Sequence, residues 1–190
     1  MHPRYRRVDR ASSRVDRAIA ERVVTIEIAA AGVEHHPVLA ALLELYVYDF
    51  SEILELDVGD DGRFYVPSLA IYASDPRCHA FLVRVDGKLA GFALVQRRSR
   101  LTGDEAVTDI AEFFVMHRYR RRGVGDHVAR AMFDRFPGRW EVREKVNNPR
   151  AIAFWRRVIG RYTNGRFEEE TRDDERWRGI VQRFDNGGSP

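Results

Sequence analysis

Residues 113–133, FFVMHRYRRRGVGDHVARAMF, decide the fold because an apolar strand pattern changes within them into an amphipathic helix pattern. Unpaired backbone N–H groups and the positive end of a helix dipole meet at such a junction. Gly123 and Gly125 allow close backbone approach and unusual dihedral angles, so that several N–H groups can point at one anion. The stretch also carries Arg118, Arg120, Arg121, Arg122 and Arg130. It therefore predicts a pyrophosphate site at the start of a helix.

Other interpretations of this loop are weighed against its setting. A basic run can be a solvated surface, and glycines at a helix start can be a plain cap. Gly123, Gly125 and Val128 resemble a dinucleotide-binding fingerprint, with Glu141 or Glu144 placed to meet a ribose. Three features argue against a dinucleotide-binding site. The third glycine of the fingerprint is absent, the loop before the glycines is long and rich in arginine, and the preceding strands form a hairpin rather than a parallel strand–helix–strand unit. A Walker loop is excluded because no Gly-Lys-Ser/Thr follows.

Length and composition limit the class of protein. The chain has 190 residues, which suits one domain, and 44% of them are hydrophobic. No stretch approaches the roughly 20 consecutive apolar residues of a membrane span. The single cysteine, Cys78, excludes an internal disulfide and a cysteine-type zinc site, and the histidines show no metal-ligand spacing. We therefore expect a cytoplasmic protein with no metal and no membrane association.

The positive charge is concentrated at the N-terminus. Residues 1–22 carry seven arginines against three acidic residues, a net charge of +4, so that the remaining residues sum to −1. This distribution does not favour a nucleic-acid-binding body. We predict a basic, disordered extension at 1–21, with a nucleic-acid or membrane arm as the alternative, a folded domain at 22–185, and a flexible C-terminus at 186–190.

The order of the predicted elements is β, α, α, β, β, β, α, β, α, β, β. A helical run that starts at Pro37 is expected to break near Tyr46 to Asp49, and Asp86 with Gly87 forms a tight hairpin turn. Hairpins and one strand–helix–strand crossover predict an α/β fold with a mixed, mostly antiparallel central sheet and helices on both faces. The predicted strands are 22–31, the two arms of 80–98, 107–115, 139–146 and the two arms of 166–184.

Two linked motifs resemble those of the GNAT superfamily of N-acetyltransferases. The first is the family's R/Q-x-x-G-x-G/A signature, matched by Arg120, Gly123 and Gly125. The second is VNNPRAIAFWRRVIG at 146–160, where Asn148 precedes an Ala-x-x-Phe-Trp helix. The element order from 22 to 184 is similar to that fold. The ending FWRRVIGRYT resembles a bacterial branch whose members are only predicted acetyltransferases.

The resemblance implies acetyl-CoA as donor and a primary amine, of a small cationic molecule or a peptide, as acceptor. The loop amides would hold the pyrophosphate, the central strand would pair with the pantetheine arm, and Asn148 would hydrogen-bond the cofactor. A homodimer is left open. The cofactor-binding residues implied are Phe113, Phe114, Val115, Arg120, Arg121, Arg122, Gly123, Val124, Gly125, Asp126, Asn148 and Trp155.

Amine acetylation needs a group that removes a proton from the amine. The predicted central strand offers Asp109 and Glu112, which fall on opposite faces of a regular strand unless a bulge intervenes. We favour Glu112 because it lies nearer the expected thioester position, and Asp109 is the alternative. Where many relatives carry a tyrosine that returns a proton to the thiolate, this chain has Trp155. CoA could then leave as the thiolate, or Tyr162 could donate the proton.

Two further functions stay open at this stage. Trp155 is compatible with a CoA-binding regulator that has lost its chemistry, and the basic loop and tail are compatible with a nucleotide- or RNA-binding module. A stretch from Glu44 to Asp61, rich in carboxylates and interleaved with tyrosines, predicts an acidic, aromatic mouth for a cationic acceptor. The alternative is a solvated helix face over an ordinary core.

Overall fold

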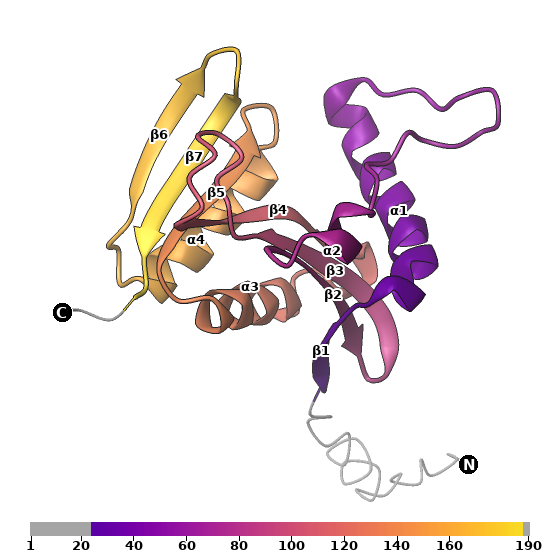
Figure 1. Ribbon diagram of the computed structural model, residues 1–190, viewed down its shortest axis with the longest axis horizontal. Helices are drawn as coiled ribbons and strands as arrows, with labels where there is room; N and C mark the ends of the chain where they lie inside the picture. Colours follow the sequence, from indigo (N-terminus) through magenta and orange to yellow (C-terminus); the bar gives the residue numbers. More distant parts are fainter. Residues whose placement is uncertain (1–23, 188–190) are drawn as a thin grey trace, which may run out of the picture.

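The computed structural model describes residues 24–187, which build one seven-stranded sheet (Figure 1). The predicted extension at 1–21 and the last positions of the predicted flexible C-terminus, 188–190, lie outside the described residues. The sheet order is β1-β2-β3-β4-β5-β7-β6. The strands are β1 (Ile26–Ala30), β2 (Cys78–Val85), β3 (Lys88–Gln96), β4 (Val107–Val115), β5 (Arg139–Lys145), β6 (Glu168–Asp173) and β7 (Arg178–Asp185).

Helices cover both faces of this sheet (Figure 1). Leu39, Leu42 and Leu43 of α1 pack on one face, and α3 and α4 pack on the other, where Phe133 and Trp155 enter the larger core. The predicted mixed α/β fold with helices on both faces is thus confirmed. The helices are α1 (His36–Leu54), α2 (Ile71–Ser74), α3 (Val124–Arg135) and α4 (Pro149–Tyr162), with 3-10 turns η2 (Val33–His35) and η3 (His117–Tyr119).

The sheet is antiparallel except between β4 and β5. These two strands run parallel and pair over three residues each, 107–109 with 139–141. Beyond that short ladder β4 continues to Val115 and β5 to Lys145 without pairing to each other. The two strands therefore diverge in the middle of the sheet, and the divergence leaves one edge of β4 open.

Two local predictions have different outcomes. The hairpin turn between β2 and β3 is confirmed, because Asp86 and Gly87 both have positive φ, at 49° and 73°. The predicted break near Tyr46 to Asp49 is wrong, since α1 runs unbroken over 19 residues. Its interior has no glycine or proline, and packing on the sheet outweighs the low helix propensity of the Tyr-Val-Tyr run. No helix within residues 24–187 is both long and apolar enough to cross a membrane.

Candidate active site

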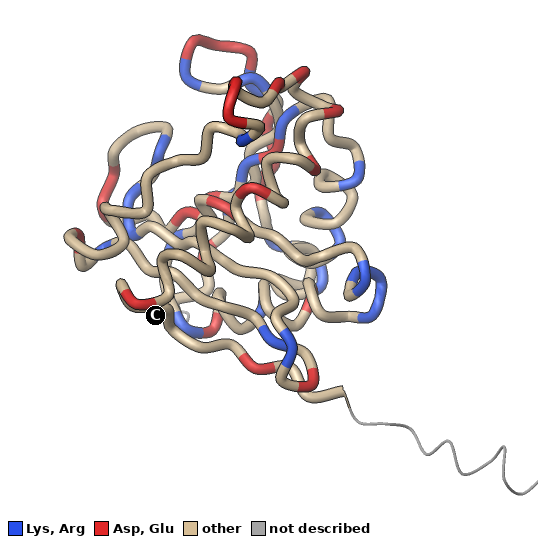
Figure 2. Tube along the Cα trace, turned by 90° about the vertical axis from the view of Figure 1, so that its right-hand side faces the viewer, with Lys and Arg blue, Asp and Glu red and all other residues tan. Residues whose placement is uncertain are grey.

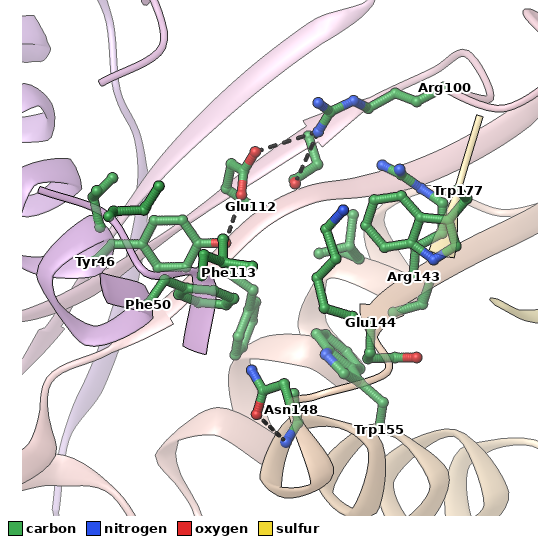
Figure 3. A pocket seen from close by; sticks show the side chains of 18 residues that line it. Tyr46, Phe50, Arg100, Glu112, Phe113, Arg143, Glu144, Asn148, Trp155 and Trp177 are labelled. Atoms are coloured by element: carbon green, nitrogen blue, oxygen red, sulfur yellow. Dashed lines mark hydrogen bonds and ion pairs between the residues drawn. The ribbon is translucent and has the colours of Figure 1, made fainter. Parts of the chain in front are cut away.

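A cavity of about 370 Å³ opens where β4 and β5 diverge (Figure 3). We call the wall formed by Phe113, Asn148, Ala151 and Trp155 the α4 side. We call the opposite wall the α1 side; it consists of Tyr46, Val47, Phe50, Leu54, Leu56, Arg100, Glu112, Arg143, Lys145 and Trp177. In Figure 3, Tyr46, Glu112 and Arg100 lie across the cavity from Asn148 and Trp155. The cavity thus has two chemically different walls.

The basic loop leads from the end of β4 into α3. Gly123 is the N-cap of α3 with φ +78°, and no side chain caps the helix. Arg121 is also left-handed, with φ +60°. The N–H groups of Gly123, Val124 and Gly125 donate no hydrogen bond to any residue among 24–187. Several adjacent free donors at a helix start form an anion site of the kind the sequence predicted.

The two glycines of the motif serve different purposes. Gly123 supplies the left-handed backbone, and an added Cβ there would meet nothing within 4 Å. At Gly125 an added Cβ would lie 3.1 Å from the Phe154 ring, so its small size lets α4 approach the start of α3. Val124 is buried in the core, and the Oδ2 of Asp126 lies 3.8 Å from the Nη1 of Arg130. Their predicted role in binding therefore concerns backbone N–H groups.

Arg120 points away from the predicted anion site. Its Nε donates to the carbonyl oxygen of Val115 at 2.6 Å, and its guanidinium pairs with Asp49 of α1. The imidazole of His117 also contacts Asp49, at 2.6 Å. Arg120 thus fastens the end of β4 to α1, while Arg121 and Arg122 are exposed beside the loop.

The predicted pantetheine-binding stretch lies on the open edge of β4. Phe113 lines the cavity and stacks on Phe154, with ring centroids 5.9 Å apart. Phe114 points toward α1 and Val115 into the larger core. A backbone edge without a partner strand, bordered by an apolar ring, can accept an extended chain as an additional strand.

Asn148 and Trp155 border the cavity from α4. The Oδ1 of Asn148 accepts from the Ala151 N–H at 3.1 Å and caps the helix, and its amide nitrogen, which faces the cavity, has no hydrogen-bond partner in the described part of the chain. Trp155 packs edge-on against Phe113 at 5.0 Å and is 5% exposed. Trp155 is therefore both a core residue and part of the cavity wall.

A bulge in β4 brings the two predicted carboxylates to one face. Leu94 pairs with Glu112 and the next residue, Val95, pairs with Ile110, so Ala111 is the extra residue. Both carboxylates therefore turn toward Arg100. The Oδ2 of Asp109 accepts from the Arg100 backbone N–H at 3.4 Å, and Glu112 Oε1 lies 3.3 Å from the Arg100 Nη1.

The two carboxylates nevertheless differ in access. Glu112 lines the cavity and also accepts a 2.6 Å hydrogen bond from the Tyr46 hydroxyl. Burial raises the pKa of Tyr46 well above its ordinary value, so Tyr46 stays a donor. Asp109 is 0% exposed and is bound by Arg143 at 3.0 and 3.2 Å. Burial raises the pKa of Asp109 and the Arg143 guanidinium opposes that rise.

Two other predicted site features lie away from the cavity. The Tyr162 hydroxyl donates to Asp134 at 2.7 Å and does not line the cavity. None of the carboxylates between Glu44 and Asp61 lines it either: Asp49 binds Arg120, and Glu44 pairs with Arg63 at 3.0 Å. The segment after α1 carries its acidic residues to the upper end of the molecule in Figure 2. The predicted acidic mouth is not formed at this cavity.

The sequence interpretation missed most of the α1 side. Arg100 comes from the β3–β4 loop, Trp177 from the β6–β7 loop, and Arg143 and Lys145 from β5. One signal was available: in β5 the residues alternate, so that Glu141, Arg143 and Lys145 share the face opposite Trp140 and Val142. The strand pattern could therefore have predicted charged groups on one face beside β4.

Buried Glu144, which the sequence offered only as a candidate ribose ligand in a dinucleotide fingerprint, also borders this cavity. It lines the cavity from β5, is 3% exposed, and neither carboxyl oxygen has a hydrogen-bond partner among the described residues. Burial, helped by nearby Glu169, raises the pKa of Glu144 to about 8. Glu144 is therefore held as a neutral acid at neutral pH.

The family comparison identifies the class of protein. The acetyltransferase (GNAT) family model matches residues 39–160, which include β4, the basic loop and most of α4. The chain belongs to this family, as its motifs predicted, and is an acetyltransferase. No curated protein matches its sequence significantly.

Solved structures share the fold at low sequence identity. An acetyltransferase from Thermus thermophilus is 16% identical in sequence. The match covers 85% of this chain and 97% of that protein, with a TM-score of 0.62. The ribosomal-protein-S18-alanine N-acetyltransferase from Escherichia coli is 17% identical, covers 87% and 97%, and has a TM-score of 0.56. Spermidine N-acetyltransferase from Vibrio cholerae, in complex with CoA and spermine, is 12% identical, covers 85% and 95%, and has a TM-score of 0.54.

Proposed function

We propose that this chain transfers an acetyl group from acetyl-CoA to a primary amine that enters the cavity from the α1 side. The amines named for two of the similar structures, an alanine of a ribosomal protein and spermidine, agree with an amine acceptor. The observation that carries the proposal is the course of the chain from β4 to α3: β4 carries the accessible carboxylate of Glu112 in the cavity, and the basic loop after it leads to the free N–H donors at the start of α3.

The residues present fit acetyl-CoA, which supplies the reactive thioester. The N–H groups from Gly123 to Gly125 would bind its pyrophosphate, with Arg121 and Arg122 adding charge. The open edge of β4 at Phe113 would hydrogen-bond the extended arm, and the free amide nitrogen of Asn148 would donate to it. These contacts come mainly from the backbone, so they position the donor and leave side chains for the chemistry.

Glu112 would remove the proton from the acceptor amine. It has a cavity-facing carboxylate, and Tyr46 and Arg100 fix its orientation through one hydrogen bond to each oxygen. Each oxygen keeps a second lone pair for the amine proton or a bridging water. Asp109 is less suited to this role because Arg143 binds both of its oxygens in the interior. Asp109 would instead hold Arg143 beside the cavity.

The test is the variant Glu112→Gln, which keeps the size and hydrogen-bonding capacity of the side chain. We expect thiol release with an accepted amine to fall by about 10² to 10⁴, because general base catalysis contributes that much. CoA affinity, measured by titration calorimetry, should change by less than about threefold, since the cofactor contacts are elsewhere. Asp109→Asn tests the alternative base.

The outcomes separate the candidate functions. A normal rate in Glu112→Gln beside a collapsed rate in a folded Asp109→Asn variant assigns the base to Asp109. If CoA binds and no amine in a broad panel releases thiol, the chain is a CoA-binding regulator. A thermal shift with short RNA or NAD, and none with CoA, supports the nucleotide-binding alternative.

A further inference from the structure

The α1 side of the cavity carries more positive than negative side chains. Its charged residues that line the cavity are Arg100, Arg143, Lys145 and Glu112. Glu144 also borders the cavity, but as a buried neutral acid. This composition is the opposite of the acidic mouth that the segment from Glu44 to Asp61 predicted. The wall that faces an incoming acceptor is therefore basic.

Of the three cationic side chains that line the cavity, Lys145 is the one without an acidic partner among the described residues. Arg143 is bound by Asp109 at 3.0 Å, and Arg100 lies 3.3 Å from Glu112. Among residues 24–187, the ammonium group of Lys145 forms neither an ion pair nor a hydrogen bond, whereas its backbone carbonyl accepts from the Asn148 N–H at 3.0 Å. Its Nζ lies 4.3 Å from the centre of the Trp177 ring. A half-buried ammonium group with only an aromatic face beside it can gain strongly from a charged partner.

The neighbourhood of Lys145 is suited to an anion. The Arg143 guanidinium lies 4.7 Å from the same Trp177 ring, so two cations gather around one indole. Because Asp109 compensates the charge of Arg143, the charge left without a partner at this indole, within the described part of the chain, is that of Lys145, and an anion beside it would match that charge. Figure 3 shows Arg143 and Trp177 together, on the same side of the cavity as Arg100. The anion would thus sit within the cavity that also contains Glu112.

We propose that the acceptor of this enzyme is an amine that also carries an anionic group, a carboxylate or a phosphate, which Lys145 binds beside Trp177. The amine end would meet Glu112 while the anionic end is held on β5. This inference rests on the proposed acetyltransferase function and names its class of acceptor. Polycations would be poor acceptors, because Arg100, Arg143 and Lys145 repel added positive charge.

The test compares matched acceptors that differ in one anionic group. The probes are β-alanine with β-alaninamide, phenylalanine with phenylalaninamide, and phosphoethanolamine with ethanolamine. We expect the anionic member of at least one pair to have the higher kcat/KM for thiol release, by about tenfold or more, as for a hydrogen bond to a charged group. The pair that shows the preference tells carboxylate from phosphate.

The variant Lys145→Gln should reduce that preference about tenfold, toward a ratio of one. Comparing the ratio between wild type and variant cancels the different amine pKa values within each pair. Lys88→Gln is the matched control, because Lys88 is exposed beside the β2–β3 turn, and it should keep the wild-type ratio. A preference for the neutral members in wild type, or an unchanged ratio in Lys145→Gln, overturns the inference and leaves the proposed function standing.

A binding measurement separates the two proposals if no probe is acetylated. Each probe is then titrated into the CoA-saturated protein and the thermal shift is recorded. Stronger stabilisation by the anionic members, lost in Lys145→Gln and kept in Lys88→Gln, supports the anion site while the proposed catalysis fails. Equal shifts within every pair overturn the anion site.

Discussion

The two walls of the cavity are built in different ways. The α4 side and the basic loop come from two short stretches, 113–126 and 148–155, and they offer mainly backbone groups to a ligand. The α1 side combines side chains from α1, three loops, β4 and β5. Its hydrogen bonds span long sequence distances, such as the 66 residues between Tyr46 and Glu112. The proposed donor site is thus encoded locally, and the proposed acceptor site depends on tertiary structure.

The difference extends to electrostatics. At the proposed donor site the described part of the chain presents unpaired N–H groups at a helix start, whose partial charges cannot be titrated. Toward the proposed acceptor site it presents ionised side chains, some of them paired, such as Arg143 with Asp109, and one, Lys145, without a partner among the described residues. A wall of charged side chains can be altered one residue at a time, while a wall of backbone donors changes only if the chain path changes. This contrast predicts how each wall responds to substitution.

The largest effect is expected from a substitution that distorts the backbone of the proposed donor site. Gly123→Val places a β-branched residue at φ +78°, a strained conformation that costs about 1–3 kcal/mol. The loop should rearrange to relieve this strain, and CoA affinity should fall about a thousandfold or more as the free N–H groups lose their alignment. Titration calorimetry measures the affinity, and chemical denaturation measures the stability.

Gly87→Val is the matched control for this prediction. Gly87 also has positive φ, at 73°, and open space around its missing side chain, but it lies in the β2–β3 turn. It should lose a similar amount of stability and keep its affinity for CoA. Normal CoA affinity in Gly123→Val would show that the basic loop is not the donor site.

These contrasts also explain how much the sequence could predict. The basic loop was predictable because the Gly123 motif acts through local backbone geometry, and the hairpin turn at Asp86 follows from the same kind of rule. The common face of Asp109 and Glu112 was not predictable, since it depends on a bulge whose position is set by the pairing of β3 with β4. The unmatched charge of Lys145 follows from which partners the other cations find, and that is a property of the tertiary structure.

A smaller effect is expected from Glu144, the buried acid at the border of the two walls. Its pKa, about 8, is above the ordinary value for glutamate, so the folded state holds a proton that the unfolded chain releases. The contribution of Glu144 to stability is therefore fully present below the ordinary glutamate pKa. It is lost as pH rises toward about 8. Over that window the wild type should lose roughly 2 to 4 kcal/mol of unfolding free energy through this group.

Glu144→Gln should remove this dependence, because the amide stays neutral at every pH. Urea denaturation from pH 5 to 9 should show that the free energy of unfolding of the variant increases relative to that of the wild type as the pH rises. Glu141→Gln is the control: Glu141 is equally buried on the other face of β5, but it pairs with Arg183 at 3.1 Å. Loss of that pair should destabilise the protein at neutral pH. Parallel stability curves for wild type and Glu144→Gln would contradict a protonated Glu144.

The smallest effect on turnover is expected at Trp155. This residue bears on how the CoA thiolate regains a proton after acetyl transfer. Among the described residues the α4 side has no acid with an accessible proton: Asn148 and Trp155 do not ionise, and the oxygens of Glu144 are buried. A thiol with a pKa of about 8.5 leaves readily as the thiolate and can take its proton from water. The missing tyrosine should therefore cost little in turnover.

The variants Trp155→Tyr and Trp155→Phe test this directly, because they differ by one hydroxyl and disturb the packing against Phe113 alike. We expect their turnover numbers to agree within about threefold between pH 6 and 9, since a positioned general acid that limited the rate would contribute 10²-fold or more. Both variants should lose some stability, about 1–3 kcal/mol, because a smaller ring leaves space in the core. A tenfold or larger advantage of Trp155→Tyr, greatest below pH 8.5 where the thiol holds its proton, would instead show that proton return limits this enzyme and that the α4 side has lost a catalytic group.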